Sequence, residues 1–287
     1  MPASIFKALN SMLVLLLLSM QLSAQETEQD LTTISTETVL FDMGDVTLTA
    51  EPGQYVLCPS RQFYDAAVSK GIDQTTFIYY AAVLVENGQT SSTVRNLAGR
   101  EFSLPNQMII PIPKGQTAST GDVVLTWWQT GSGMQRAIVV GGTETEPVVR
   151  YLDISLDNPS GAGLREDTLK PDSFVRLTDQ WQPGSTVAVT TEQSTIHGQL
   201  LAVSESKVLV REFAGKLNMY DRENAMPLPV VPELGEGDAA QAALWGSFKP
   251  VTVTRVDSEI GRVYANFTLG REEQEKVIAF GDIYIER

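Results

Sequence analysis

The chain has 287 residues, of which 43% are hydrophobic, and it carries a formal net charge of −14 at pH 7. This length allows one large or several small folded domains. A strongly acidic chain repels phosphate backbones and anionic membrane surfaces, so the composition excludes nucleic acid as an expected partner. The single cysteine, Cys58, excludes an intrachain disulfide, and its apolar surroundings YVLC predict a buried thiol.

Residues 1–24 carry the pattern of a secretory signal peptide. Lys7 precedes the apolar block MLVLLLLSM, and the stretch Leu-Ser-Ala that ends at Ala24 follows it. We predict cleavage after Ala24, and hence an exported, periplasmic or extracellular protein with no membrane span in the mature chain. A retained N-terminal anchor is the alternative interpretation. Residues 25–38 are acidic and rich in threonine, which predicts a flexible lead-in.

Four stretches of the remaining chain repeat one order of short apolar runs. Each begins with a glycine and a polar residue; these glycines are Gly53, Gly121, Gly184 and Gly237. The third run is the most alike across the stretches, and it starts at Val94, Val149, Val210 and Val263. β-Branched and aromatic residues dominate the runs, which favours strands, and the repeat indicates an array of small units. We therefore predict an all-β fold with units at 39–114, 115–178, 179–231 and 232–287.

The second unit contains one short pattern, formed by Gly121, Asp122, Val124, Trp127 or Trp128, Ala137, Val139, Val149, Tyr151 and Asp153. In these residues it resembles Tudor-like and agenet-type repeats of the Src-homology-3-like barrel class. The resemblance implies a tandem array of four small β-barrels. In that family aromatic rings can form a cage for methylated Lys or Arg. Met134 and Gln135 replace the aromatic pair expected before Ala137, so we do not expect methyl-lysine recognition.

Aromatic residues supply the candidate binding site. Trp127 and Trp128 are adjacent on a predicted strand, so their side chains point to opposite faces. One of them faces solvent, a neighbouring unit or a ligand, and the same holds for Tyr80 and its neighbour. The candidate ligand-binding residues are Trp127, Trp128, Tyr151, Asp153 and Tyr80. Packing between units is the alternative interpretation.

Few residues suggest catalysis. His197 is the only histidine, and the sequence TIHGQ predicts a solvent-facing turn for it. Motifs for zinc proteases, phosphate-binding loops and dinucleotides are absent from the sequence, so we expect no cofactor and no metal. Glu272, Glu273 and Glu275 form the densest acidic cluster, which predicts a solvated turn. A carboxylate pair for glycoside hydrolysis stays open, because such pairs depend on distance in space.

These observations predict an exported, non-enzymatic binding or scaffold protein that engages a protein, a peptide or a cell-envelope polymer. Two alternatives remain. One is a carbohydrate-active hydrolase, or its accessory, that uses a carboxylate pair. The other is a structural subunit of a surface assembly.

Overall fold

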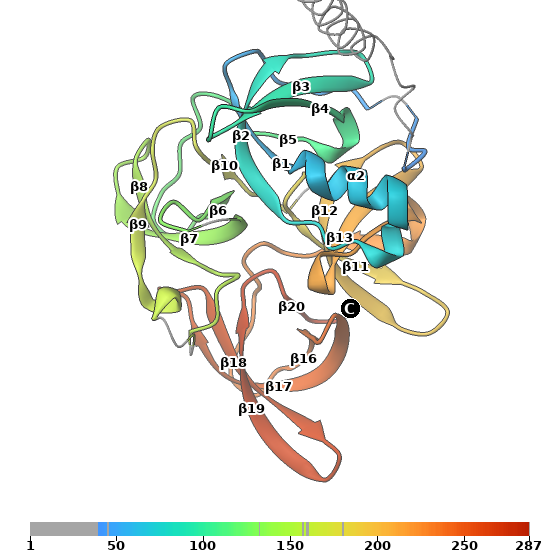
Figure 1. Cartoon of the computed structure of the whole chain (residues 1–287). Coiled ribbons are helices and arrows are strands. Elements are labelled where there is room, and N and C mark those ends of the chain that lie inside the picture. Colours follow the sequence, from blue (N-terminus) through green and yellow to red (C-terminus); the bar gives the residue numbers. More distant parts are fainter. Residues whose placement is uncertain are drawn as a thin grey trace, which may run out of the picture. The chain divides into compact units, whose positions relative to one another are not determined.

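The computed structural model describes residues 40–286, apart from Asp45, Ser132, Asp157, Pro159, Ser160 and Gln180. The predicted signal peptide and the predicted lead-in at 25–38 lie outside the described residues. Strands dominate the described part of the chain, which confirms the predicted all-β class. The strands succeed one another along the chain in four groups of five, which we call modules 1 to 4 (Figure 1).

The bounds of these elements are as follows. Module 1 contains β1 (Tyr55–Pro59), α2 (Arg61–Lys70), β2 (Tyr79–Glu86), β3 (Ser91–Asn96), β4 (Glu101–Pro105) and β5 (Ile110–Pro111). Module 2 contains β6 (Val123–Trp127), β7 (Met134–Gly142), β8 (Pro147–Tyr151), β9 (Glu166–Thr168) and β10 (Val175–Arg176). Module 3 contains β11 (Thr186–Thr190), β12 (Thr195–Val203), β13 (Lys207–Glu212), β14 (Leu217–Asp221) and β15 (Ala225–Pro227). Module 4 contains β16 (Ala239–Leu244), β17 (Ser247–Asp257), β18 (Arg262–Leu269), β19 (Glu272–Ala279) and β20 (Ile283–Tyr284). Short 3-10 turns are η1 (Ile72–Gln74), η2 (Asn106–Met108), η3 (Ala162–Leu164), η4 (Phe213–Gly215) and η5 (Arg222–Asn224).

The same antiparallel pairing order recurs in every module. The first four strands form a meander, and the short fifth strand returns to pair with the first strand. A sequence that repeats its runs in one order therefore repeats its hydrogen-bonding pattern as well. Modules 1 and 2 each form a five-stranded sheet, whereas modules 3 and 4 share a ten-stranded sheet through the pairing of Ile196 with Ser247.

The repeated glycines occupy one structural position. Each has a positive φ, between 87° and 94°, in the turn before the first strand, a conformation that glycine adopts at little steric cost. The amide of each glycine donates to a carbonyl of the second strand, next to the point where the pairing register of that strand shifts. In module 1, for example, Gly53 N donates to Leu84 O over 2.8 Å, and Leu84 N donates back to Gln54 O over 2.9 Å. In every module the register of the second strand shifts one or two residues beyond this carbonyl.

The third strands are equivalent in three modules and displaced in the fourth. Val94, Val149 and Val210 each pair with the second-strand residue that accepts the glycine amide. In module 4 that partner, Val253, pairs with Ala265 and not with Val263. The predicted alignment of the fourth unit was therefore wrong by two residues, because the chain between Val253 and its partner in the β17–β18 hairpin is two residues longer than in the other modules.

The sheets are not closed barrels. Within the described residues, the fourth and fifth strands lie at opposite ends of each module's pairing order and do not pair with each other. The expectation of closed barrels is therefore not met by the hydrogen bonding.

The sequence patterns did not predict the fourth strand of each module. Its sequence is short or charged, as in Glu166–Thr168 and Glu272–Ala279, and lacks the apolar run used to find the other strands.

One hydrophobic core extends through all four modules. Buried side chains from successive modules pack in a single cluster, among them Val56, Ile138, Leu201 and Val253. Cys58 belongs to this cluster and is 2% exposed, which confirms the predicted buried thiol. Modules 2 and 3 each add a separate small core. Units this small bury little surface alone, so the shared core supplies part of their stability.

Candidate functional site

A buried arginine joins modules 2, 3 and 4. Arg136, on β7, donates from Nε to Asp153 Oδ1 over 2.9 Å and from Nη2 to Asp282 Oδ2 over 2.9 Å. Its Nη1 donates to the hydroxyl of Thr186 over 2.8 Å and to the carbonyl of Phe280 over 3.1 Å. Charge-assisted bonds of this kind are strong, so Arg136 fixes the three modules at one point.

His197 extends this cluster from module 3. Its Nε2 lies 2.9 Å from Asp282 Oδ1, and its ring packs edge-on against Phe248. Burial alone would raise the pKa of Asp282, but Arg136 and His197 outweigh that effect and lower it. An ionised carboxylate only accepts hydrogen bonds, so Nε2 of His197 carries the proton. The predicted solvent-facing turn was wrong: His197 lies in β12 and its side chain is 22% exposed.

Arg262 is a second buried arginine at the same junction. Its guanidinium donates to three main-chain carbonyls of module 2, those of Tyr151, Leu152 and Ile154, over 2.8–2.9 Å. It is 4% exposed, and its Nε has no hydrogen-bond partner among the described residues. Burial lowers the pKa of this guanidinium. Asp153 and Asp282 favour its charged form, but among the described residues Arg262 forms no ion pair, and its direct partners are neutral carbonyls.

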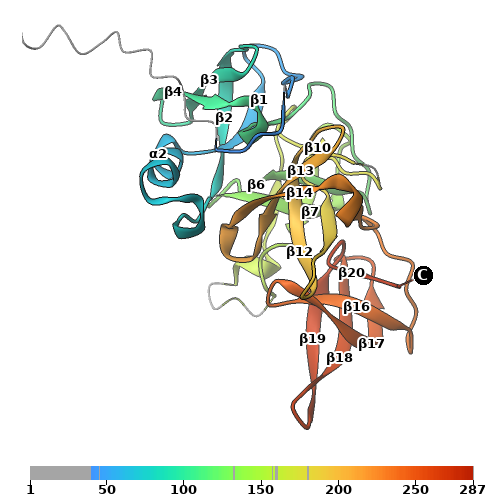
Figure 2. The same cartoon turned by 90° about the vertical axis from the view of Figure 1, so that its right-hand side faces the viewer.

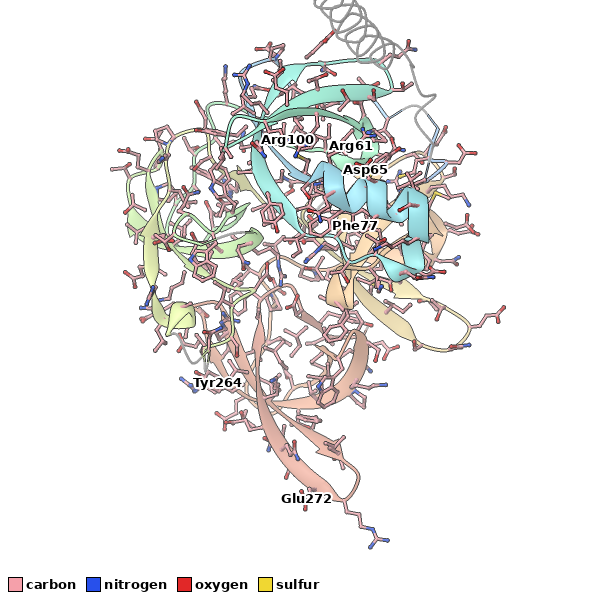
Figure 3. The ribbon with its side chains drawn as sticks, viewed as in Figure 1. Arg61, Asp65, Phe77, Arg100, Tyr264 and Glu272 are labelled. Carbon is pink, nitrogen blue, oxygen red and sulfur yellow. The ribbon has the colours of Figure 1, made fainter. Side chains whose placement is uncertain are left out.

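These residues line a cavity of about 610 Å³ between the modules. Its walls include the segments around Arg136, His197, Arg262 and Asp282. They also include η4, the turn between β16 and β17, and the C-terminal half of β19 (Lys276–Ala279), which we call its inner end. Module 1 reaches the junction through the segment after η1, where Phe77 N donates to Gly215 O over 2.8 Å (Figure 3). A cavity of this size suits a small ligand or one end of a larger one.

Two exposed aromatic rings border the cavity. Phe213 and Trp245 are each 62% exposed, and both line it. Phe213 lies against the turn that carries Trp245, since a Cβ at Gly246 would come within 2.6 Å of Phe213 Cβ. Trp245 also packs edge-on against Phe267, with ring centroids 5.6 Å apart. Exposed rings grouped at a cavity are typical of binding sites.

Both rings belong to left-handed turns. Trp245 has φ +53° and precedes Gly246 with φ +87° in the two-residue connection from β16 to β17. Such connections favour Asn-Gly, and a bulky residue there is an outlier. Ala214, which follows Phe213, has φ +57°. Backbone strain of this kind concentrates at functional sites, and here it accompanies the exposed rings.

The predicted aromatic residues lie away from this cavity. Trp127 is 7% exposed and packs against Tyr55 of module 1, with ring centroids 5.2 Å apart. Tyr151 is 1% exposed and donates its hydroxyl proton to Asp167 over 2.8 Å. Trp128 packs edge-on against Tyr151.

Tyr80 lies on β2, stacks against Phe63 of α2 and lines no described cavity. Of the predicted residues, only Asp153 lines the junction cavity. Sequence reasoning missed Phe213, Trp245 and Arg262. The pair Trp245-Gly246 between two apolar runs was an available turn signal, but nothing local marks the other two residues.

The cluster is poorly suited to acid–base catalysis. Glycoside hydrolysis needs one carboxylic acid with a raised pKa, whereas the pKa of Asp282 is lowered and Asp153 is engaged by Arg136. Glu212 accepts from Asn218 and Tyr220. No cluster of three or more metal-ligating side chains occurs in the part of the chain that the structure describes.

Comparison of the chain with protein-family models gives no match, and neither does comparison with curated proteins. The helices among the described residues are all too short or too polar to cross a membrane. The geometry of the junction cavity is therefore the basis for assigning a function.

Proposed function

We propose that the chain is an exported, non-enzymatic binding protein made of four Src-homology-3-like modules in an open form, at 39–114, 115–178, 179–231 and 232–287. The resemblance around Gly121 and the recurring pairing order, with the fifth strand beside the first, support this class. The partner is a protein, a peptide or a cell-envelope polymer, and it enters the junction cavity. The hydrolase alternative needs a carboxylic acid with a raised pKa, whereas Arg136 and His197 lower the pKa of Asp282 at this cavity.

The observation that carries the proposal is the pair of exposed rings on left-handed turns at the cavity. Phe213 and Trp245 leave most of their surface in water beside the cavity, so a ligand that covers them gains the free energy of burying that apolar surface. The cavity behind them joins three modules through Arg136, so its walls are preformed and little ordering is required on binding.

A binding screen with two arrays of defined probes tests the proposal. The labelled chain lacking residues 1–24 is applied to an array of synthetic peptides and to an array of purified oligosaccharides. We expect binders in one array, and we expect Phe213→Ser with Trp245→Ser to weaken their binding at least tenfold. Leu97→Ser with Leu164→Ser is the matched control, because these residues are 62% and 60% exposed and line no described cavity. Binding that survives the aromatic substitutions, or no binding in either array, would contradict the proposal.

A further inference from the structure

The strand β19 presents a free edge that runs into the junction cavity. It has eight residues and pairs only with β18 among the described strands. Its last four residues, Lys276–Ala279, line the cavity. Its first residue, Glu272, lies near the tip of the β18–β19 hairpin, which extends away from β16 and β17 (Figures 2 and 3). An unpaired edge is a template for an added strand.

The charge along this edge changes from acidic to basic. The tip carries three carboxylates, Glu272, Glu273 and Glu275, and one cation, Arg271, all exposed. Glu273 and Glu275 accept hydrogen bonds from the neutral side chains of Asn266 and Thr254, over 3.1 and 2.9 Å. Within the described residues, none of the three carboxylates forms an ion pair. The tip therefore favours a cationic stretch of ligand.

The inner end of the edge meets cations that form no ion pair with the described residues. Among the described residues Lys276 and Arg211 form no ion pair, and Arg211 donates from Nε to the carbonyl of Phe77 over 3.4 Å. Arg262 lies behind them, with an unpartnered Nε. Three carboxylates also line the cavity: Asp153 and Asp282 are engaged by Arg136, and Glu212 accepts hydrogen bonds from Asn218 and Tyr220. An anionic group entering the cavity would gain charge-assisted hydrogen bonds.

We infer that the ligand is an extended peptide that adds to the edge of β19 and places its free C-terminal carboxylate in the junction cavity. This inference rests on the proposed function and names the ligand class for its site. The N-terminal half of the peptide is basic and lies along Glu272–Glu275. The last side chain is apolar and packs against Phe213 and Trp245. Since the carboxylate lies at the inner end, the peptide runs parallel to β19, over about eight residues at roughly 3.3 Å each.

The test uses three synthetic peptides on the chain lacking residues 1–24. The first has eight residues, alternates Lys and Thr over its first five, ends in Val-Val-Leu with a free carboxylate, and carries fluorescein at its N-terminus. The second is its C-terminal amide, and the third has the reversed order. Fluorescence anisotropy should show the first peptide binding at least about tenfold more tightly than the other two, since two charge-assisted bonds are at stake.

Variants separate the two ends of the site. Arg211→Gln with Lys276→Gln should reduce the preference for the free acid over the amide to less than about threefold. The triple variant Glu272→Gln, Glu273→Gln and Glu275→Gln should weaken the binding of the free-acid peptide and of its amide by a similar factor. Lys249→Gln is the control, because Lys249 is an exposed lysine of the same module that does not line the cavity. Hydrogen exchange should slow at amides of β19 when the peptide is bound.

Three outcomes would overturn the inference: equal binding of acid and amide, equal binding of the reversed peptide, or no peptide binding. If oligosaccharides then bind in a manner that depends on Phe213 and Trp245, the proposed function stands and only the peptide assignment fails. If no probe depends on these two rings, both fail.

Discussion

Nη2 of Arg136 lies 2.9 Å from Oδ2 of Asp282, although 146 positions separate the two residues in the chain. Arg136 lies in the second strand of module 2 and Asp282 directly before the last strand of module 4, and these modules share no sheet. The side chain of Arg136 is 6% exposed and that of Asp282 is 19% exposed. The pair is therefore shielded from water and holds together modules that main-chain pairing does not connect.

Replacing Arg136 should destabilise the whole protein. Arg136→Met leaves Asp153 and Asp282 partly buried without their cation, so the free energy of unfolding should fall by about 3–5 kcal/mol. Urea denaturation measures the change. Arg95→Ala is the control, because the Arg95–Glu101 pair is about half exposed and should contribute at most about 1 kcal/mol. Similar losses for the two variants would show that the buried cluster is not a structural centre.

Acid should weaken the junction through Asp282. Because its folded-state pKa lies below the unfolded value of about 3.9, ionised Asp282 stabilises the fold above about pH 4, and this contribution is lost as the pH falls through the folded-state pKa. Asp282→Asn should therefore show a shallower loss of the free energy of unfolding than the wild type between about pH 4.5 and about pH 3. Asp221→Asn removes an exposed ion pair and should keep the wild-type slope. Parallel curves for Asp282→Asn and the wild type would refute this assignment.

The two tryptophans at 127 and 245 should differ in their effect on stability. Trp127→Ala removes a buried ring and should lower the free energy of unfolding by about 3–5 kcal/mol. Trp245→Asn removes an exposed ring that contacts Phe267, but it also relieves a left-handed backbone that Asn tolerates. The two effects should leave stability within about 1 kcal/mol of the wild type. Thermal unfolding compares the variants, and a large loss for Trp245→Asn would indicate a structural role for its ring.

Two repeated glycines should respond differently to alanine. Gly237 has φ +89° and open space where an added Cβ would lie, so Gly237→Ala should cost about 1–2 kcal/mol from the backbone alone. At Gly184, with φ +94°, the added Cβ would also lie 2.5 Å from Leu125 Cδ2 of module 2. Gly184→Ala should therefore cost about 1–3 kcal/mol more. Denaturant titrations measure the free energy of unfolding of both variants. Equal losses for Gly184→Ala and Gly237→Ala would show that only the local turn matters.

Cys58 should resist alkylation in the folded protein. Burial raises the pKa of its thiol to about 12, so it stays protonated at neutral pH, and only the thiolate reacts quickly. We expect iodoacetamide to label Cys58 in urea and to leave the native chain unlabelled over the same period, as measured by intact mass. Rapid labelling of the native chain would show that β1 opens readily.

The first three strands of each module and their order were predictable from the sequence. Apolar runs of β-branched and aromatic residues and the glycines before them act locally, so Gly53 and its counterparts mark the same turn in every module. The fourth strands were not predictable in this way. Glu272–Ala279 is mostly charged, and only pairing with β18 makes it a strand.

The site was decided by the tertiary structure. Glycines 184 and 237 look alike in the repeat, yet only one of them meets a side chain of another module. His197, Arg136 and Asp282 come from three modules, and their side chains meet only because a shared core brings those modules together. The apolar runs and the turn glycines depend on neighbours a few residues apart, which the sequence displays. Burial and electrostatic energies depend on which atoms meet across the fold, and that information is absent from any short stretch of the chain.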